Sequence, residues 1–208
     1  MVVDTQIELY HFAECPYCEK VRRALDYYDL EYKSHIIDPA DRSEVEEISG
    51  QSLVPVIVDG DNVVNDSTEI IKYLDEHYSN SLHLVPERAH EKSHALIWNE
   101  FAELSWGTLG YRAQKGTDKA GNKLSARDME NLQSEISRES KLLNDYLSES
   151  EFLVGNEFSI ADIAMSSFIS RLTEFSDFDI SEEHKNLWTW FERVNEVIEN
   201  AEMELAEA

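Results

Sequence analysis

The sequence predicts a chain of two domains, an α/β domain with a mixed sheet followed by an all-α domain. Three observations predict this class: strand-like and helix-like segments alternate up to about residue 80, strand signals then stop, and apolar residues recur at helical spacing beyond residue 90. A chain of 208 residues is long enough for two small domains. We expect the α/β domain at 1–79, a linker at 80–90 and the helical domain at 91–208.

The first strand is expected over residues 6–11, where polar and apolar side chains alternate. Pro16 then suits the first turn of a helix, because its missing N–H needs no partner there. A second strand is expected over 32–37. The helix between the strands carries one apolar stripe at helical spacing, formed by Cys18, Val21, Leu25 and Tyr28.

A short helix over 43–48 is expected to end near Gly50. Residues 54–58 and 63–64 flank the turn sequence Asp-Gly-Asp-Asn, which indicates a hairpin. Asp66 suits the start of the next helix, with Glu69 placed for a capping box. The order is therefore β-α-β-α-β-β-α. We expect the first strands, which helical crossovers join, to be parallel and the hairpin pair to be antiparallel.

The remainder of the chain is expected to hold four helices. Apolar residues indicate the first over 91–113, and a polar loop follows over 114–124. Ser-x-x-Asp sequences are typical of capped helix starts. The second helix is expected to start at Ser125-x-x-Asp128 and the third at Ser159-x-x-Asp162. The fourth is expected to cover 183–199.

The chain is strongly acidic, with 43 acidic and 18 basic residues and a net charge of -25. Such a surface repels nucleic-acid phosphates and anionic membranes, so neither is expected as a partner. The acids are dispersed, which favours adaptation to a salty cytoplasm, as in halophilic proteins, over a patch for a basic partner. The chain has neither a run long enough to span a membrane nor a signal peptide, so we expect it to be cytoplasmic.

The two cysteines both lie in one Cys-x-x-Cys sequence, Cys15-Pro16-Tyr17-Cys18. A structural zinc site needs four ligands, and His11 would give only three, so no metal is expected. Cys15 falls at a helix N-terminus, where free N–H groups stabilise a thiolate. Cys18 lies on the same side of the helix, in the buried stripe. This placement indicates an attacking and a resolving thiol, and two unreactive core cysteines are the less favoured interpretation.

The charges around the motif do not decide how reactive Cys15 is. Glu14 and Glu19 would raise the pKa of its thiol, and Lys20, Arg22 and Arg23 would oppose them.

Two further elements are candidates for a binding site. Val54-Pro55 opens a strand, and with the cysteine motif nearby we favour a cis peptide bond that presents the Val54 backbone to a substrate, over a trans proline at the start of the strand. Asp66-Ser67 opens a helix whose free N–H groups suit a carboxylate, while Asp66 could hold an ammonium. An ordinary helix cap also explains Asp66-Ser67, and local evidence favours this interpretation.

With these elements in order, the first 80 residues resemble the N-terminal, thioredoxin-like domain of the glutaredoxin and glutathione S-transferase superfamily, and the whole chain resembles its two-domain members. The cysteine motif is similar to the dithiol glutaredoxin site. Gly155-Asn156-Glu157-Phe158-Ser159-Ile160-Ala161-Asp162 is similar to the superfamily's structural capping motif. The resemblance implies catalytic residues Cys15 and Cys18, and it implies a set of cofactor-binding residues: Tyr17, Gln51, Val54, Pro55, Asp66 and Ser67.

The resemblance implies a glutaredoxin-like reductase of disulfides or mixed disulfides, working with glutathione or another γ-glutamyl thiol such as γ-glutamylcysteine. Arg42 is a candidate for the glycine carboxylate of glutathione. A transferase that conjugates a thiol to an electrophile is the second hypothesis, although it would not need Cys18. A non-enzymatic interaction module is the third, although it would need no Cys-x-x-Cys. Small thiols and disulfides are the expected partners, and a monomer and a homodimer are both compatible.

Overall fold

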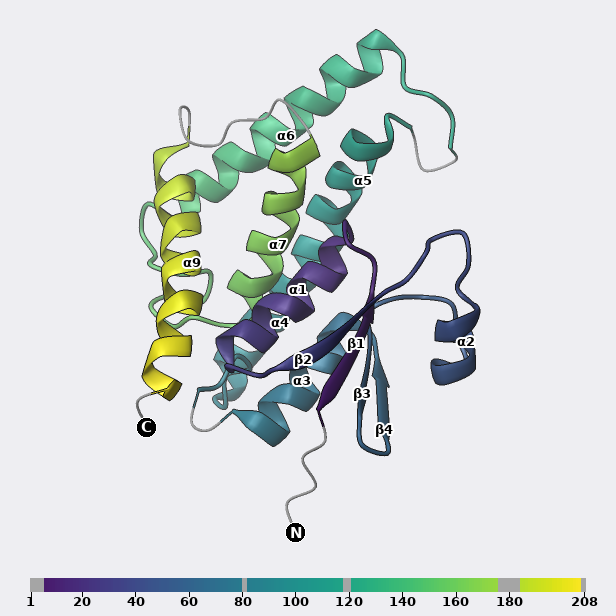
Figure 1. The fold of residues 1–208 in the computed structure, drawn as a ribbon. Helices are drawn as coiled ribbons and strands as arrows, with labels where there is room; N and C mark the ends of the chain where they lie inside the picture. Colours follow the sequence, from purple (N-terminus) through teal and green to yellow (C-terminus); the bar gives the residue numbers. More distant parts are fainter. Residues whose placement is uncertain (1–5, 80–81, 118–120, 176–183, 207–208) are drawn as a thin grey trace. The chain divides into compact units, whose positions relative to one another are not determined.

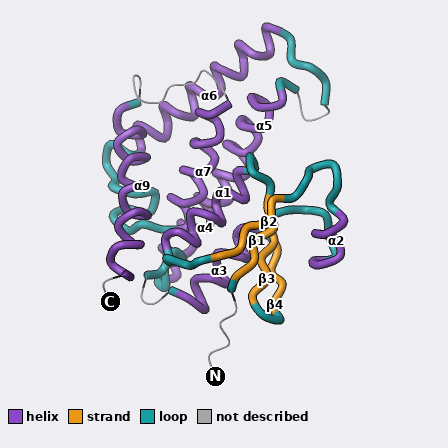
Figure 2. Tube along the Cα trace, viewed as in Figure 1, coloured by secondary structure: helices purple, strands orange, loops and turns teal. Residues whose placement is uncertain are grey.

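The structure is a computed structural model that describes residues 6–79, 82–117, 121–175 and 184–206. The chain divides into two compact units, residues 1–85 together with 197–208, and residues 86–196. Figure 1 shows the chain as a ribbon and Figure 2 colours its helices and strands. The fold is that of a thioredoxin-like domain with a helical C-terminal domain, as the sequence predicts.

The first unit holds a four-stranded sheet with the strand order β2-β1-β3-β4. The β1 strand is parallel to β2 and antiparallel to β3, and β3 is antiparallel to β4. Figure 1 shows α1 and α3 on one side of the sheet and α2 on the other. The elements are β1 (Ile7–His11), α1 (Pro16–Tyr27), β2 (Tyr32–Ile36), α2 (Ser43–Ser49), β3 (Val56–Asp59), β4 (Asn62–Asn65) and α3 (Ser67–Tyr78).

The expectation of parallel first strands holds for β1 and β2 but is wrong for β3. His11 pairs with Ile36, and Tyr10 pairs with Val56, so β2 ends and β3 begins at the same edge of the sheet. The chain therefore leaves and re-enters the sheet at one edge. A helix of seven residues, α2, connects the strands there without crossing the length of the sheet.

The core of this unit follows the predicted apolar stripe. Three of its residues, Cys18, Val21 and Leu25, are fully buried, and Tyr28 is 2% exposed. The α1 helix packs against α3. Asp66 caps α3 through bonds from the Thr68 and Glu69 backbone N–H groups. The expected capping box is replaced by an ion pair, since the Glu69 carboxylate contacts Lys72 at 2.8 Å.

The second unit is helical. Its first predicted helix is interrupted by a π-helical turn, η1 (Ala102–Trp106), where the backbone hydrogen bonds change spacing between α4 and α5. The predicted final helix, α9, begins at Lys185, while Glu183 lies outside the described residues. The other helices are α4 (Ala89–Phe101), α5 (Gly107–Lys115), α6 (Ala126–Tyr146), α7 (Ile160–Phe175) and α9 (Lys185–Ala206), whose last residues belong to the first unit.

Both predicted Ser-x-x-Asp caps are present. Ser125 and Asp128 form a reciprocal capping box at α6. Asp162 is fully buried at the start of α7, where one carboxylate oxygen accepts from Ser159 and the other from Leu153 N and Trp190 Nε1. Burial raises the pKa of Asp162 to about 6 against these donors. Asp162 is thus a structural anchor.

In the described ranges, every helix is too short or too polar to cross a lipid bilayer.

Candidate active site

Three segments that the sequence singled out meet at one edge of the sheet. The pairing register aligns Tyr10 with Val56 and Val56 with Asn65. The chain continues from β1 into the cysteine motif, enters β3 from the Val54–Pro55 peptide, and leaves β4 into the start of α3. Residues that are far apart in the sequence therefore lie at the same edge of the sheet. The segments are Cys15–Cys18, Val54–Pro55 and Asp66–Ser67.

Cys15 is the N-cap residue of α1, with φ -85° and ψ 123°, and Pro16 follows in the first turn. Its side chain is half-buried and is a free thiol. The Cys18 thiol donates to the Cys15 sulfur, the backbone N–H groups of Cys18 and Tyr17 point to it, and Arg22 lies nearby. Together these groups lower the pKa of Cys15 to about 7, although partial burial opposes them. A substantial fraction of Cys15 is therefore thiolate at neutral pH.

Cys18 has the opposite environment. It is fully buried and is also a free thiol. Burial, followed by the Cys15 thiolate to which it donates, raises the pKa of Cys18 far above its ordinary range. Cys18 therefore keeps its proton while Cys15 is charged, and the two thiols are chemically distinct.

The structure resolves the balance of charges that the sequence left open. Glu19 is paired with Arg22 at 2.5 Å and with Arg23 at 3.3 Å, so its charge is compensated within α1. Glu14 is exposed. Arg22 acts on Cys15 and lowers the pKa of its thiol. The positive charge of Arg22 therefore affects the pKa of Cys15 more than the nearby acids do.

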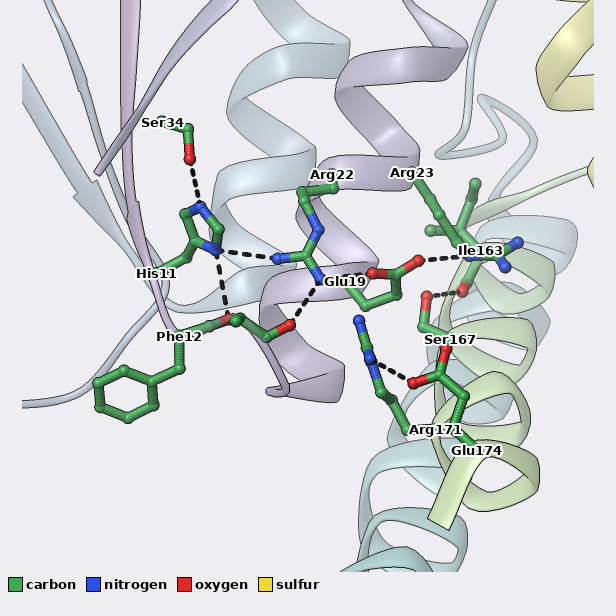
Figure 3. A network of polar contacts seen from close by, with 11 residues as sticks. His11, Phe12, Glu19, Arg22, Arg23, Ser34, Ile163, Ser167, Arg171 and Glu174 are labelled. Carbon is green, nitrogen blue, oxygen red and sulfur yellow. Dashed lines mark hydrogen bonds and ion pairs between the residues drawn. The ribbon is translucent and has the colours of Figure 1, made fainter. Parts of the chain in front are cut away.

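Arg22 also anchors the loop that leads to Cys15, as Figure 3 shows. Its guanidinium lies 2.9 Å from His11 Nδ1 and donates to the Ala13 carbonyl at 3.4 Å. Because a guanidinium can only donate, His11 accepts at Nδ1 and donates from Nε2 to Ser34 Oγ at 2.7 Å. The Phe12 carbonyl, 3.2 Å from Nδ1, is not an acceptor in this tautomer. Burial lowers the pKa of His11, which keeps the ring neutral.

This network uses residues that sequence reasoning did not assign to a site. The sequence presents His11 only as a metal ligand, yet both of its ring nitrogens form hydrogen bonds. The sequence presents Arg22 only as a charge near Cys15. The available signal was spacing, because Arg22 lies one helical turn beyond Cys18 and faces the end of β1.

The loop before β3 is held in place by side chains. The Val54–Pro55 peptide bond is cis, which confirms the prediction. Gln51 binds both backbone groups of Leu53, accepting from N at 2.6 Å and donating to O at 2.8 Å. Arg42 donates to the Ser52 carbonyl at 3.2 Å and stacks over the Phe12 ring. These contacts tie the loop to the segment that precedes Cys15.

The start of α3 combines a strained cap with a buried hydroxyl. Asp66 has φ 70°, a backbone conformation that a non-glycine residue adopts at a cost of about 1–3 kcal/mol. Its Oδ1 accepts from Thr68 N at 2.9 Å and from Glu69 N at 3.2 Å. Ser67 is 4% exposed, and its Oγ accepts a hydrogen bond from Lys20 Nζ at 3.3 Å. Lys20, like His11 and Arg22, contributes to this region although the sequence assigns it no site role.

The fold is a thioredoxin-like domain with two free thiols, Cys15 and Cys18, at the start of its first helix, joined to a helical domain. Residues 9–82 match the family model of the glutathione S-transferase N-terminal domain, and residues 103–197 match that of the C-terminal domain. The chain belongs to the glutathione S-transferase family.

Several relatives and solved structures are similar to this chain. It is 26% identical to glutathione S-transferase D6 of Drosophila melanogaster over 201 residues, 92% of this chain and 88% of the relative. It is 38% identical to mouse prostaglandin E synthase 2 over 73 residues, 33% of this chain, and so spans only about a fifth of that relative's length (19%). A glutathione transferase from Phanerochaete chrysosporium has a TM-score of 0.80 at 24% identity, covering 100% of this chain and 99% of that one.

Proposed function

We propose that this protein is a thiol–disulfide oxidoreductase in which Cys15 is the nucleophile and Cys18 is the resolving thiol. The observation that carries the proposal is the opposite displacement of the two pKa values within one Cys-x-x-Cys. A nucleophile needs to be ionised and accessible, and Cys15 is half-buried with a pKa of about 7. The resolving thiol needs to stay neutral until the mixed disulfide has formed, and Cys18 is protonated and buried.

The reaction follows from these two states. The Cys15 thiolate attacks one sulfur of a substrate disulfide, forms a disulfide with it, and releases the other sulfur as a thiolate. Cys18 then loses its proton and attacks the Cys15 sulfur, which releases the second substrate sulfur. The substrate gains two electrons and, with the Cys18 proton and one proton from solvent, leaves as two thiols. The enzyme is left with a Cys15–Cys18 disulfide.

The residues at the start of α3 fit the α-amino acid end of a γ-glutamyl thiol. Among the described residues, the Ser67 hydroxyl only accepts, so its hydrogen remains available to a carboxylate. Asp66 caps the helix through Oδ1 alone, which leaves Oδ2 for an ammonium. The residues proposed to hold such a thiol are Tyr17, Gln51, Val54, Pro55, Asp66 and Ser67. Gln51 acts there by shaping the loop, since its amide is bound to Leu53.

Two molecules of such a thiol supply the two electrons that return the enzyme disulfide to its reduced form. Glutathione is the first candidate because solved structures of similar fold contain it, two as oxidised glutathione and one as the reduced thiol. The shorter γ-glutamylcysteine shares the same amino acid end and remains the alternative.

Substitution of each cysteine tests the proposal. Cys15→Ser should abolish the reduction of both protein disulfides and small mixed disulfides, because the nucleophile is lost. Cys18→Ser should lose most protein-disulfide reduction but keep turnover of a small mixed disulfide, since a second thiol molecule can resolve the Cys15 adduct. Mass spectrometry should find that adduct on Cys15. An active Cys15→Ser variant would overturn the assignment.

A transferase is the second candidate, and the comparisons favour it, because relatives aligned over most of the chain are named glutathione S-transferases. In that reaction a cofactor thiol would attack an electrophile and no enzyme disulfide would form. Both activities can be measured on one preparation, with an aryl halide as the electrophile and a glutathione mixed disulfide as the oxidant. Conjugation that survives in a Cys18→Ala variant, without disulfide reduction by the wild type, would favour the transferase.

A further inference from the structure

A lysine is fully buried between α1 and the start of α3. Lys20 has no exposed surface, and it lies in the first helix of the domain, two residues after Cys18. Its Nζ lies 2.7 Å from Thr68 Oγ1 and 3.3 Å from Ser67 Oγ. The ammonium therefore reaches across the α1–α3 interface to the first two residues of α3.

Burial of an ammonium is strongly unfavourable before its partners are counted, and an apolar side chain of the same length is often at least as stabilising. Stability alone therefore does not explain Lys20. Its effect on Ser67 is more specific. An ammonium can only donate, so Ser67 Oγ accepts and the Ser67 hydrogen is left pointing elsewhere. Lys20 thus holds Ser67 as a hydrogen-bond donor.

The charge of Lys20 also matters at this helix end. The Asp66 carboxylate caps α3 and satisfies two of its N–H groups, which weakens the attraction of that end for an anion. A second carboxylate placed there would be repelled by Asp66. The ammonium beneath Ser67 and Thr68 supplies the compensating positive charge.

We propose that Lys20 is a positioning and specificity residue that makes the start of α3 select a carboxylate, the α-carboxylate of the γ-glutamyl thiol, over a neutral group. This inference rests on the proposed function for the identity of the ligand. Lys20 acts through the Ser67 hydroxyl, which it orients, and through its charge.

A matched pair of ligands tests the proposal: glutathione, and the analogue in which the γ-glutamyl α-carboxylate is a primary amide. Affinities are measured by NMR titration of the reduced protein. The wild type should prefer the carboxylate by about tenfold or more, as expected for a hydrogen bond to a charged group. Lys20→Met should lose most of this preference. Lys72→Met removes a cation from the exposed face of α3 and should keep it.

A purely structural role for Lys20 predicts a different result, in which Lys20→Met weakens both ligands equally. That outcome, or an unchanged preference in Lys20→Met, would overturn the proposal. If Lys20→Met does not fold, Lys20→Gln keeps an N–H donor without the charge and should retain only part of the preference; full retention would contradict the charge's role. Failure of the wild type to bind either ligand would instead overturn the proposed cofactor, whatever the result with the cysteine variants.

Discussion

At the scale of single residues, the candidate site depends on which atoms can donate and which can only accept. The Cys18 thiol donates to Cys15, which favours the thiolate of Cys15 and disfavours that of Cys18. Arg22 donates to His11, which fixes the tautomer that reaches Ser34. The guanidinium of Arg22 can only donate, and the opposite pKa shifts of the two thiols make Cys18 the donor, so each bond has a defined direction.

The donor role of Cys18 can be tested by substitution. It is the largest cause of the lowered Cys15 pKa, so Cys18→Ala should raise the pKa of Cys15 and slow its alkylation by iodoacetamide at pH 7. Cys18→Ser keeps a hydroxyl donor in the same place and should raise that pKa less. The measurement is the pH midpoint of the alkylation rate. Equal midpoints in the two variants would show that the Cys18 thiol does not act as a donor.

At the scale of elements, the sequence predicts helices and caps better than it predicts their connections. The buried face of α1 and the cap at Ser125 are local features, set by spacing and by side chains within four residues. The direction of β3 depends on where the α2 connection returns to the sheet, which is a tertiary property. The π-helical turn after Phe101 likewise has no local signal in this sequence.

The same distinction explains which site residues could be predicted. Cys15 and Asp66 lie in recognisable positions at helix starts. In the sequence Lys20 counts only as a charge near Cys15, although Ala24 and Tyr27, four and seven residues further along the helix, are buried. Because residues at this spacing lie on one side of a helix, their apolar character indicates that Lys20 is buried as well. Its contact with Ser67, 47 residues away, could not be found without the α1–α3 packing.

The capping box of α6 gives a prediction at this scale. Ser125 Oγ accepts from Asp128 N at 3.2 Å, and Asp128 Oδ2 accepts from Ser125 N at 3.0 Å. Ser125→Ala should reduce the free energy of unfolding by about 1 kcal/mol, the usual loss for a removed N-cap. Urea denaturation measures the change. Ser134→Ala, on the exposed side of the same helix, is the control and should be neutral or slightly stabilising.

The effect of the capping box should also depend on pH. The Ser125 side chain, followed by its backbone N–H, lowers the pKa of Asp128 below its ordinary value of 3.8. A group whose pKa is lowered on folding stabilises the protein above its unfolded pKa and loses this contribution as pH falls through the folded pKa. The difference between wild type and Ser125→Ala should therefore shrink below about pH 4. A difference that grows on acidification would contradict the assignment.

At the scale of the whole molecule, charge is the dominant feature. The chain carries 43 acidic residues against 18 basic ones. Ion pairs such as Arg88 with Glu157 use part of the basic minority, but an exposed pair contributes only about 0–1 kcal/mol. Most acids are left to repel one another. Self-repulsion of this kind destabilises the compact state wherever screening is weak.

Salt should therefore stabilise this protein. The Debye length falls from about 30 Å at 0.01 M to about 3 Å at 1 M, so molar potassium chloride removes most of the repulsion between exposed charges. Salt also weakens exposed ion pairs, but these contribute little to stability, so the loss of repulsion is the larger effect. With a net charge of -25, the melting temperature should rise markedly over this range. Replacing the exposed Glu46 and Glu47 by glutamine should reduce the dependence on salt, because less repulsion remains to be screened. A melting temperature that stays constant or falls as potassium chloride rises would contradict adaptation to salt. It would favour a basic partner as the reason for the acidic surface.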